Sequence, residues 1–301
     1  MMTDASLQHE PAVARDERAA TVAALLAVAL WSTVATGFKL GLAVLEPVQL
    51  LLLGSTFSAL LFAGASSLRG AWRIDARGLR QCALLGALNP LCYYLVLFEA
   101  YDRLPAQLAQ PLNYTWAITL ALLAVPVLGQ RLTRRALGGI VLSYAGVVIL
   151  LSRGHWGLPP DTDWIGVALA LGSTILWAGY WLLNTRSTAP ALTLMTWSFC
   201  LALPPLALIC WLGPGFPEPG WPALGYAVWV GAVEMGITFL LWQRALRLTA
   251  HAARIGQLIF LSPFLSLLLI GGVLGETIEP SSVAGLAVIV GGLLVARRPG
   301  L

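Results

Sequence analysis

The chain has 301 residues, of which 58% are hydrophobic and only 11% are charged. Soluble domains carry about 25% charged residues, so this composition excludes an ordinary water-soluble protein and indicates that lipid surrounds most of the chain. The net charge of +4 is distributed without a Lys/Arg-rich run, and we therefore expect no nucleic-acid partner.

The chain begins with a polar leader, residues 1–19, which includes Arg15 and Arg18. The apolar run behind it is about twenty residues long, which is longer than the core of a signal peptide. We therefore predict that this run is retained as the first transmembrane helix and that the leader is cytoplasmic.

Ten apolar runs follow one another through the chain. Each is close to the length of about 20 residues that a helix needs to cross the hydrocarbon core. The runs lie near residues 20–41, 46–66, 80–100, 105–127, 135–152, 163–184, 190–212, 222–243, 249–273 and 281–296. The connections between them are short and leave no room for a soluble domain. The sequence therefore predicts an all-α polytopic membrane protein with ten transmembrane helices.

The basic residues indicate which ends of these helices face the cytoplasm. If the N-terminus is cytoplasmic, only three of the 18 Lys and Arg residues fall in outer segments, namely Lys39, Arg103 and Arg153. This assignment agrees with the excess of Lys and Arg that cytoplasmic loops carry. Removing any one helix from this count would destroy the alternation between segments rich in basic residues and segments poor in them. We expect a multi-pass protein of the bacterial inner membrane with both termini in the cytoplasm.

The two halves of the chain resemble one another. Val127-Leu128-Gly129-Gln130 precedes the fifth apolar run, and Val273-Leu274-Gly275-Glu276 precedes the tenth, 146 positions later. Trp31 falls on Trp177 at the same offset. These matches indicate an internal duplication.

A further match supports the duplication and divides the chain into two units. Arg103-Leu104-x-Ala106 corresponds to Arg247-Leu248-x-Ala250 at an offset of 144, so short gaps separate the two alignments. We place the first repeat at residues 20–153 and the second at 163–298. Each unit has five helices, an odd number, so the second enters the membrane from the opposite side. Transporters built from such inverted repeats bind substrate near the bilayer midplane, where the repeats meet.

The end of the second repeat carries a characteristic series of residues. Pro263 lies in its fourth helix, Leu274-Gly275-Glu276 follows, and Gly285 and Gly292 lie in the last helix. In these features the sequence resembles the drug/metabolite transporter superfamily, in its ten-helix form with two EamA-type repeats. The resemblance covers nearly the whole chain. The aromatic-rich central helices of the chain are similar to those of bacterial aromatic amino acid exporters in that superfamily.

The first repeat departs from this pattern. Gln130 replaces the acid, and Pro126 lies later than the proline of the family. We therefore expect Glu276 to cap or orient a helix end rather than to act in both repeats. The resemblance implies that the first, third, fourth, sixth, eighth and ninth helices line a central cavity, with the fifth and tenth at the periphery.

Aromatic and amide side chains near the middle of the helices are the candidate substrate-binding residues. A hydroxyl or an indole N–H lacks a partner in hydrocarbon, so such residues should face the protein interior. Two alternatives remain open for them, a packed core and a cavity wall. The candidates are Trp31, Tyr93, Tyr94, Asn113, Tyr114, Trp116, Trp177, Tyr180, Trp181, Gln257 and Phe260.

Two amides and one acid have particular chemistry. Asn113 corresponds to Gln257 at the offset of 144, so both repeats offer an amide, either to substrate or to an interhelical hydrogen bond. Glu234 is the acid nearest the centre of a helix, and intramembrane acids are functional candidates. It could couple transport to protons or contact a substrate amine. The alternative is a structural glutamic acid hydrogen-bonded to a neighbouring helix.

Small residues repeat at a spacing of four, which allows helices to pack closely. The pairs are Gly139-x-x-x-Ser143, Gly292-x-x-x-Ala296 and Gly271-x-x-x-Gly275. Packing within one chain is the first interpretation of these pairs. A homodimer through the fifth and tenth helices is the alternative, so we expect either a monomer or a weak homodimer.

The distribution of charge narrows the function. Phosphorylated substrates usually need cations, and no Lys or Arg lies at the centre of a predicted helix. The three His residues have no metal-ligand spacing, so we expect no metal, no cofactor and no enzyme activity. The sequence predicts a transporter that exports aromatic or other neutral amino acids and related small amphiphiles. A multidrug or cationic amphiphile exporter is the alternative, ahead of a membrane-embedded enzyme.

Overall fold

The computed structural model of the protein describes residues 16–129, 133–155, 159–184, 186–187, 189–218 and 220–297. Most of the predicted polar leader, including Arg15, lies outside the described residues, and so does Gln130. Within the described ranges the chain forms helices, turns and loops without a strand. The predicted all-α fold is confirmed.

Nine helical spans of the described chain are long and apolar enough to cross a membrane, and a shorter apolar helix follows them. We number them in chain order as spans 1 to 10. They are Glu17–Leu42, Pro47–Arg69, Ala76–Arg103, Ala106–Val127, Arg134–Ser152, Trp164–Asn184, Ala191–Leu212, Trp221–Leu248, Arg254–Leu274 and the shorter Pro280–Ala296. These are the ten predicted helices, with ends that differ by a few residues.

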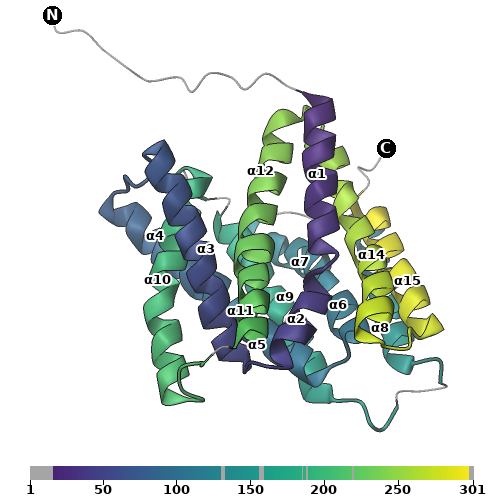
Figure 1. Ribbon diagram of the computed structural model, residues 1–301. Helices are drawn as coiled ribbons and strands as arrows, with labels where there is room; N and C mark the ends of the chain where they lie inside the picture. Colours follow the sequence, from purple (N-terminus) through teal and green to yellow (C-terminus); the bar gives the residue numbers. More distant parts are fainter. Residues whose placement is uncertain are drawn as a thin grey trace, which may run out of the picture.

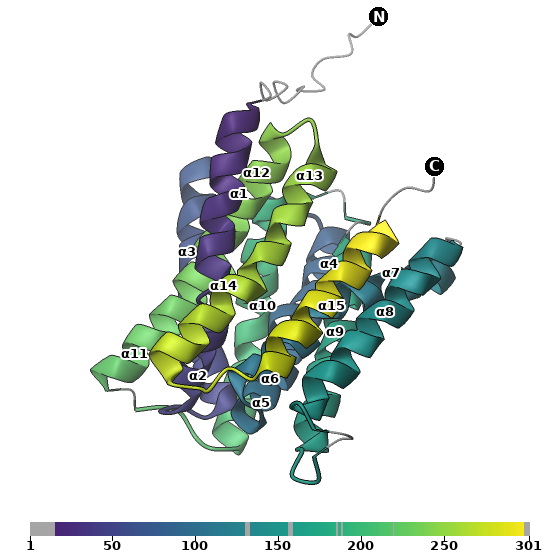
Figure 2. The same ribbon diagram turned by 90° about the vertical axis from the view of Figure 1, so that its right-hand side faces the viewer.

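The first and last helices place the two ends of the described chain on the same side of the bundle. In Figure 1 and Figure 2 α1 (Glu17–Trp31) starts at the top of the bundle, and α15 (Pro280–Arg297) runs upward and ends toward the same side. We call this the terminal end of the bundle and the opposite one the distal end. An even number of spans requires this arrangement. Five spans in each half also require that the second half runs through the bundle in the opposite direction.

Five spans are continuous helices. They are spans 2, 5, 6, 7 and 10, which consist of α3 (Pro47–Arg69), α8 (Arg134–Ser152), α9 (Trp164–Asn184), α10 (Ala191–Leu212) and α15. The other five are interrupted. In the first repeat, span 1 consists of α1 and α2 (Val34–Leu42), span 3 of α4 (Ala76–Gly86), the π-helix η1 (Ala87–Cys92) and α5 (Tyr93–Arg103), and span 4 of α6 (Ala106–Tyr114) and α7 (Trp116–Leu128). In the second repeat, span 8 consists of α11 (Trp221–Val228), the π-helix η2 (Trp229–Ile237) and α12 (Thr238–Leu248). Span 9 consists of α13 (Ala252–Gln257), the 3-10 helix η3 (Leu258–Leu261), α14 (Ser262–Leu269) and the π-helix η4 (Ile270–Leu274).

Hydroxyl side chains satisfy backbone groups at several interruptions. Ser32 and Thr33, between α1 and α2, donate to carbonyls of the preceding turn at 2.6 and 2.7 Å. Thr115 does the same between α6 and α7, at 2.7 Å from the carbonyl of Leu112. Unpaired backbone groups are costly at membrane depth, because lipid offers no hydrogen bonds. These local bonds allow the helices to be broken inside the bundle.

The helices of spans 5 and 10 pack tightly against each other. Added Cβ atoms on Gly139 and Gly146 would lie 2.5 and 2.7 Å from the carbonyl oxygens of Gly292 and Gly285. The Ser143 hydroxyl donates to the carbonyl of Ile289 at 3.0 Å. Figure 2 shows α8 and α15 side by side along one side of the bundle. The predicted small-residue packing within one chain is therefore confirmed for these two helices.

Gly275 has a different role from the one that its spacing to Gly271 indicates. It ends η4 with φ at 70°, a left-handed conformation that glycine adopts without steric cost. The glycine is therefore needed for the turn that follows the helix and not for helix packing. This turn delivers the next residue, Glu276, to the start of span 4.

Glu276 caps α6 at the distal end. Its carboxylate oxygens accept the backbone N–H groups of Ala106 at 2.8 Å and Gln107 at 3.2 Å. The Gln107 side chain binds the same loop, because its amide nitrogen donates to the carbonyl of Thr277 at 2.9 Å. A carboxylate at a helix N-terminus satisfies orphan donors and complements the helix dipole. The prediction that Glu276 caps a helix end is confirmed.

Glu17 makes the matching contact at the terminal end. It accepts the backbone N–H of Ala250 at 2.5 Å and the hydroxyl of Thr249 at 2.9 Å, just ahead of α13. Ala250 is the repeat counterpart of Ala106. Both repeats therefore hold the equivalent backbone N–H with a carboxylate, although the two acids occupy unrelated positions in the sequence.

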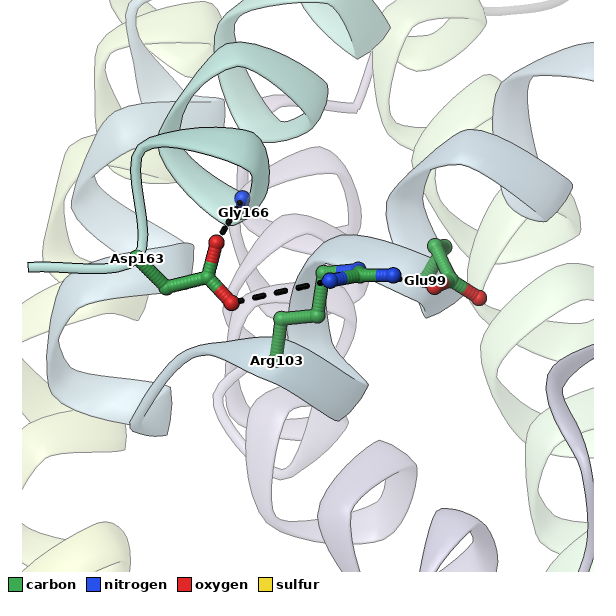
Figure 3. A network of polar contacts seen from close by, with 4 residues as sticks. All are labelled: Glu99, Arg103, Asp163 and Gly166. Atoms are coloured by element: carbon green, nitrogen blue, oxygen red, sulfur yellow. Dashed lines mark hydrogen bonds and ion pairs between the residues drawn. The ribbon is translucent and has the colours of Figure 1, made fainter.

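An ion-pair cluster joins spans 3 and 6 at the distal end. Arg103 contacts Glu99 at 2.8 Å and Asp163 at 3.7 Å, and Asp163 accepts the backbone N–H of Gly166 at 2.8 Å (Figure 3). The two ion pairs are more than a third exposed, so each contributes about 0–1 kcal/mol. The cluster orients the start of α9 more than it stabilises the fold.

Replacing Glu276 with Ala should lower the thermal unfolding temperature of the detergent-solubilised protein. The change removes both acceptors of the α6 N-terminus, and the loss of such a cap costs about 0.5–2 kcal/mol. Glu276→Gln keeps one acceptor and should lose less. Glu279→Ala, in the same loop, is the matched control, because its carboxylate takes no part in the cap. An equal loss for Glu276→Ala and Glu279→Ala would contradict the assignment.

Candidate substrate cavity

A cavity of about 630 Å³ lies inside the bundle. Its lining residues come from spans 1, 3, 4, 6, 8 and 9, the six that the family resemblance implies. No described residue of α8 or α15 lines it. Five of the six lining spans are interrupted, so the broken helices surround the cavity and the continuous ones lie mostly outside it.

Aromatic rings dominate the cavity wall. The aromatic lining residues are Trp31, Phe38, Tyr93, Tyr94, Tyr101, Tyr114, Trp116, Trp177, Trp181, Phe239 and Trp242. The polar groups besides the tyrosines and tryptophans are Gln110, Asn113 and Glu234. Among the described lining residues Glu234 is the only charged one, and none is Lys, Arg or His.

Most of the candidate residues lie in this wall. They are Trp31, Tyr93, Tyr94, Asn113, Tyr114, Trp116, Trp177, Trp181 and Glu234. Tyr180, Phe260 and Gln257 do not line the cavity. Tyr180 lies behind the wall, with its ring stacked on Trp177 at 5.6 Å. Phe260 is 6% exposed and packs in the hydrophobic core.

Gln257 is exposed on the outside of the bundle. Its neighbour Gly256 and then Ile259 face the cavity instead. These two positions are three residues apart, so they share one helix face, and Gln257 is turned about 100° away from Gly256. Of the two amides that correspond in the repeat, Asn113 lines the cavity and Gln257 does not.

Trp177 contacts several other rings of the aromatic wall. Tyr93 stacks on it at a centroid distance of 4.6 Å, and Trp116 and Phe239 approach it edge-on at 6.5 and 6.1 Å. Phe239 also contacts Trp31 at 5.6 Å. Trp31 and Trp177, which correspond in the repeat, thus both touch the ring of Phe239.

The sequence analysis missed several lining residues, among them Phe239, Trp242, Phe38 and Gln110. Phe239, Trp242 and Leu246 follow a helical spacing, which could have been recognised. The π-helix η2 hides their relation to Glu234, which precedes Phe239 by five positions. Residues five positions apart lie on nearly opposite sides of a regular α-helix, but the wider turn of the π-helix brings Glu234 and Phe239 to one face.

Asn113 connects three spans at the cavity wall. It accepts the hydroxyl of Tyr93 at 3.4 Å, and its amide nitrogen donates to the hydroxyl of Ser173 at 3.0 Å. These bonds join spans 3, 4 and 6. The interhelical hydrogen bond considered for Asn113 is therefore present, and the side chain also borders the cavity.

Glu234 projects from the π-helix η2 into the cavity and is 7% exposed. The hydroxyl of Tyr94, on span 3, donates to one carboxylate oxygen at the long distance of 3.5 Å. The other oxygen has no partner among the described residues. The side-chain oxygen of Gln110 and the indole nitrogen of Trp181, which also line the cavity, are buried without a partner among the described residues. Such atoms mark the places where a ligand can form hydrogen bonds.

The family model of the EamA-like transporter family matches the chain twice, at residues 18–152 and 164–298. The chain belongs to the EamA-like transporter family. Each match spans five helices of the bundle, as expected for a ten-helix protein built from two EamA repeats. It is therefore a multi-pass membrane transporter of small molecules.

This EamA-like transporter is similar to curated proteins that are named as exporters. It is 28% identical over 294 residues to the aromatic amino acid exporter YddG of Ancylobacter novellus, covering 92% of this chain and 96% of that protein. It is 25% identical over 277 residues to a probable terminal-alkyne amino-acid exporter of Streptantibioticus cattleyicolor, covering 92% of each. A solved crystal structure matches with a TM-score of 0.65 and 24% identity, over 94% of this chain and 97% of the other, which supports the fold.

The distal part of the cavity wall is formed by aromatic rings that pack together. Phe38, which is 1% exposed, packs there against Phe98 at 4.7 Å and Tyr101 at 5.3 Å. The Lys39 ammonium group donates to the carbonyl of Tyr101 at 2.8 Å and thereby fixes the end of α5. Toward the terminal end, aliphatic residues such as Ala124 continue the lining. The cavity therefore extends from an aromatic plug toward the side that carries the termini.

A cysteine at Gly256 should react with a water-soluble maleimide, because Gly256 lines the cavity and space surrounds it. The measurement uses a background in which the four native cysteines are replaced by alanine. Leu268→Cys is the control, because Leu268 is 73% exposed on the outer face of α14, where lipid excludes the reagent. Equal labelling at the two positions would contradict a water-filled cavity at Gly256.

Proposed function

We propose that this protein exports aromatic or other neutral amino acids, and related small amphiphiles, across the bacterial inner membrane by alternating access. The observation that carries the proposal is the cavity between the repeats, whose described lining residues form an aromatic wall with one carboxyl group and no Lys, Arg or His. Two relatives named as amino acid exporters support the same substrate class.

The size and chemistry of the cavity suit such solutes. Its volume of about 630 Å³ lies within the range of about 300–1,000 Å³ that small-molecule sites occupy. Ring faces attract other aromatic rings and ammonium groups. Phosphorylated solutes usually require Arg or Lys, and the described lining has neither. Amphiphilic amines and zwitterions therefore fit better than sugar phosphates or nucleotides.

The direction of the cavity fits an inward-facing state of the proposed transport cycle. We expect the terminal end to be cytoplasmic, because α3 ends and α4 begins there, a stretch that holds Arg69, Arg73 and Arg77. By contrast, α2, which holds Lys39, and the end of α5 at Arg103 belong to the distal end. With that orientation the aromatic plug around Phe38 faces outward, and the cavity extends toward the cytoplasm. Opening the plug while the terminal end closes would complete an alternating-access cycle around the cavity.

A monomer is the proposed transporting unit. The glycine faces of α8 and α15 already pack against each other inside one chain. A dimer through the same faces would have to break this packing. The small-residue pairs of these helices therefore give no support to a homodimer.

Replacing Trp116 with Ala should reduce uptake of labelled tryptophan into proteoliposomes by roughly tenfold, because the wall loses a ring contact worth about 0.5–1.5 kcal/mol together with apolar area. Tyr114→Ala should act in the same direction. Trp221→Ala is the matched control, because Trp221 is 87% exposed at the start of α11 and outside the cavity. Normal transport by both wall variants, with correct folding, would remove them from the site.

Replacing Glu234 with Gln should flatten the pH dependence of transport if protons drive export. Among the described lining residues Glu234 is the only carboxylic acid, so it is the group that could carry a proton through the cavity. The measurement is initial flux in proteoliposomes at several pH values, with and without an imposed pH gradient. An unchanged profile in folded Glu234→Gln protein would exclude the coupling role.

A further inference from the structure

We propose that the free oxygen of Glu234 is an ammonium-binding site, and that the cavity selects its substrates by their amine and not by their carboxylate. The ligand class is primary alkyl amines that carry an aromatic ring, with aromatic amino acids as one subclass. This inference rests on the proposed function, because it assigns the chemistry of the same cavity. The argument depends on how the acids of this chain are paired and on which donors and acceptors the cavity offers.

The two acids that hold the equivalent backbone N–H groups of the repeats, Glu276 and Glu17, have both carboxylate oxygens paired. Glu276 accepts two backbone N–H groups at 2.8 and 3.2 Å. Glu17 accepts the N–H of Ala250 at one oxygen and the Thr249 hydroxyl at both. Glu234 differs, because it has one long bond from Tyr94 at 3.5 Å and one oxygen without a partner in the described part of the chain. A purely structural role does not account for a 7% exposed carboxyl group that is left half satisfied in a cavity wall.

The surroundings of Glu234 suit a cation. The ring of Tyr94, whose hydroxyl contacts the carboxyl group, lies 4.8 Å from the ring of Tyr93. Aromatic faces attract an ammonium group, and a charge-assisted bond to a carboxylate is about twice as strong as a neutral one. An unpaired carboxylate on a side chain that is 7% exposed is costly, and a bound ammonium group would neutralise it.

The cavity offers little to a substrate carboxylate. No described lining residue is Lys, Arg or His. The amide nitrogen of Asn113 already donates to Ser173 at 3.0 Å. The indole N–H of Trp181 is a donor without a partner, but it carries no charge. A zwitterion at Glu234 would therefore leave its own negative charge uncompensated, whereas a simple amine cation would leave the site neutral.

The experiment is competition against labelled tryptophan in proteoliposomes, with three probes that share one ring system. Tryptamine has the amine alone, indole-3-propionate has the carboxylate alone, and unlabelled tryptophan has both. Tryptamine should compete at least as well as tryptophan, and indole-3-propionate should be weaker by roughly tenfold or more, because charge-assisted bonds are the stronger ones. Equal or better competition by indole-3-propionate would overturn the proposal.

Glu234→Gln keeps the shape of the side chain and removes its charge. It should weaken competition by tryptamine by roughly tenfold, because the charge-assisted hydrogen bond is lost. Glu234→Asp keeps the charge and should retain the preference for tryptamine over indole-3-propionate. Glu218→Gln is the matched control, because Glu218 is exposed in the loop before α11 and outside the cavity lining. An unchanged ranking of the probes in folded Glu234→Gln protein would also overturn the proposal.

Ligand-induced thermal stabilisation of the detergent-solubilised protein separates this inference from the proposed function. If tryptophan is not transported but tryptamine stabilises the wild type and not Glu234→Gln, the ammonium site stands and amino acid export fails. If tryptophan is transported but tryptamine neither competes nor stabilises, export stands and the ammonium site is overturned.

Discussion

The requirement that backbone N–H and C=O groups be paired inside a membrane governs this structure. Helices satisfy it without help, but the spans around the cavity are interrupted, and each interruption frees backbone groups in a place where lipid offers no partner. Ser32, Thr33 and Thr115 satisfy carbonyls at two of these breaks. These side chains supply additional hydrogen bonds at places where helices end and restart within the bundle.

Two carboxylates solve the same problem at the starts of spans 4 and 9. Glu276 holds the N–H of Ala106 at the distal end, and Glu17 holds that of the equivalent Ala250 at the terminal end. Only Glu276 belongs to the motif at the end of a repeat. The duplication is thus more symmetric in its hydrogen bonds than in its sequence, because a backbone donor needs an acceptor but does not require that it come from one position.

The cavity combines an apolar aromatic surface with very few unpaired polar atoms. The rings position one another: Phe239 lies between Trp31 and Trp177, one tryptophan from each repeat. The amide of Asn113 is used to join spans, so it contributes less to recognition than its location indicates. Recognition by hydrogen bonds then falls to Glu234, Gln110 and Trp181, each of which has a buried atom without a partner among the described residues.

The sequence by itself determined the ten helices, the duplication, the capping role of Glu276 and most of the aromatic wall, because hydropathy and repeat offsets are local properties of the chain. It could not determine which residue on each turn faces the cavity. The π-helix η2 brings Phe239 to the side of Glu234, and the short α13 presents Gly256 while Gln257 faces outward. The partner of Glu17 lies 233 positions away, so only the tertiary structure brings the two together. Helix phase and long-range pairing depend on how the whole bundle packs, and no window of the sequence contains that information.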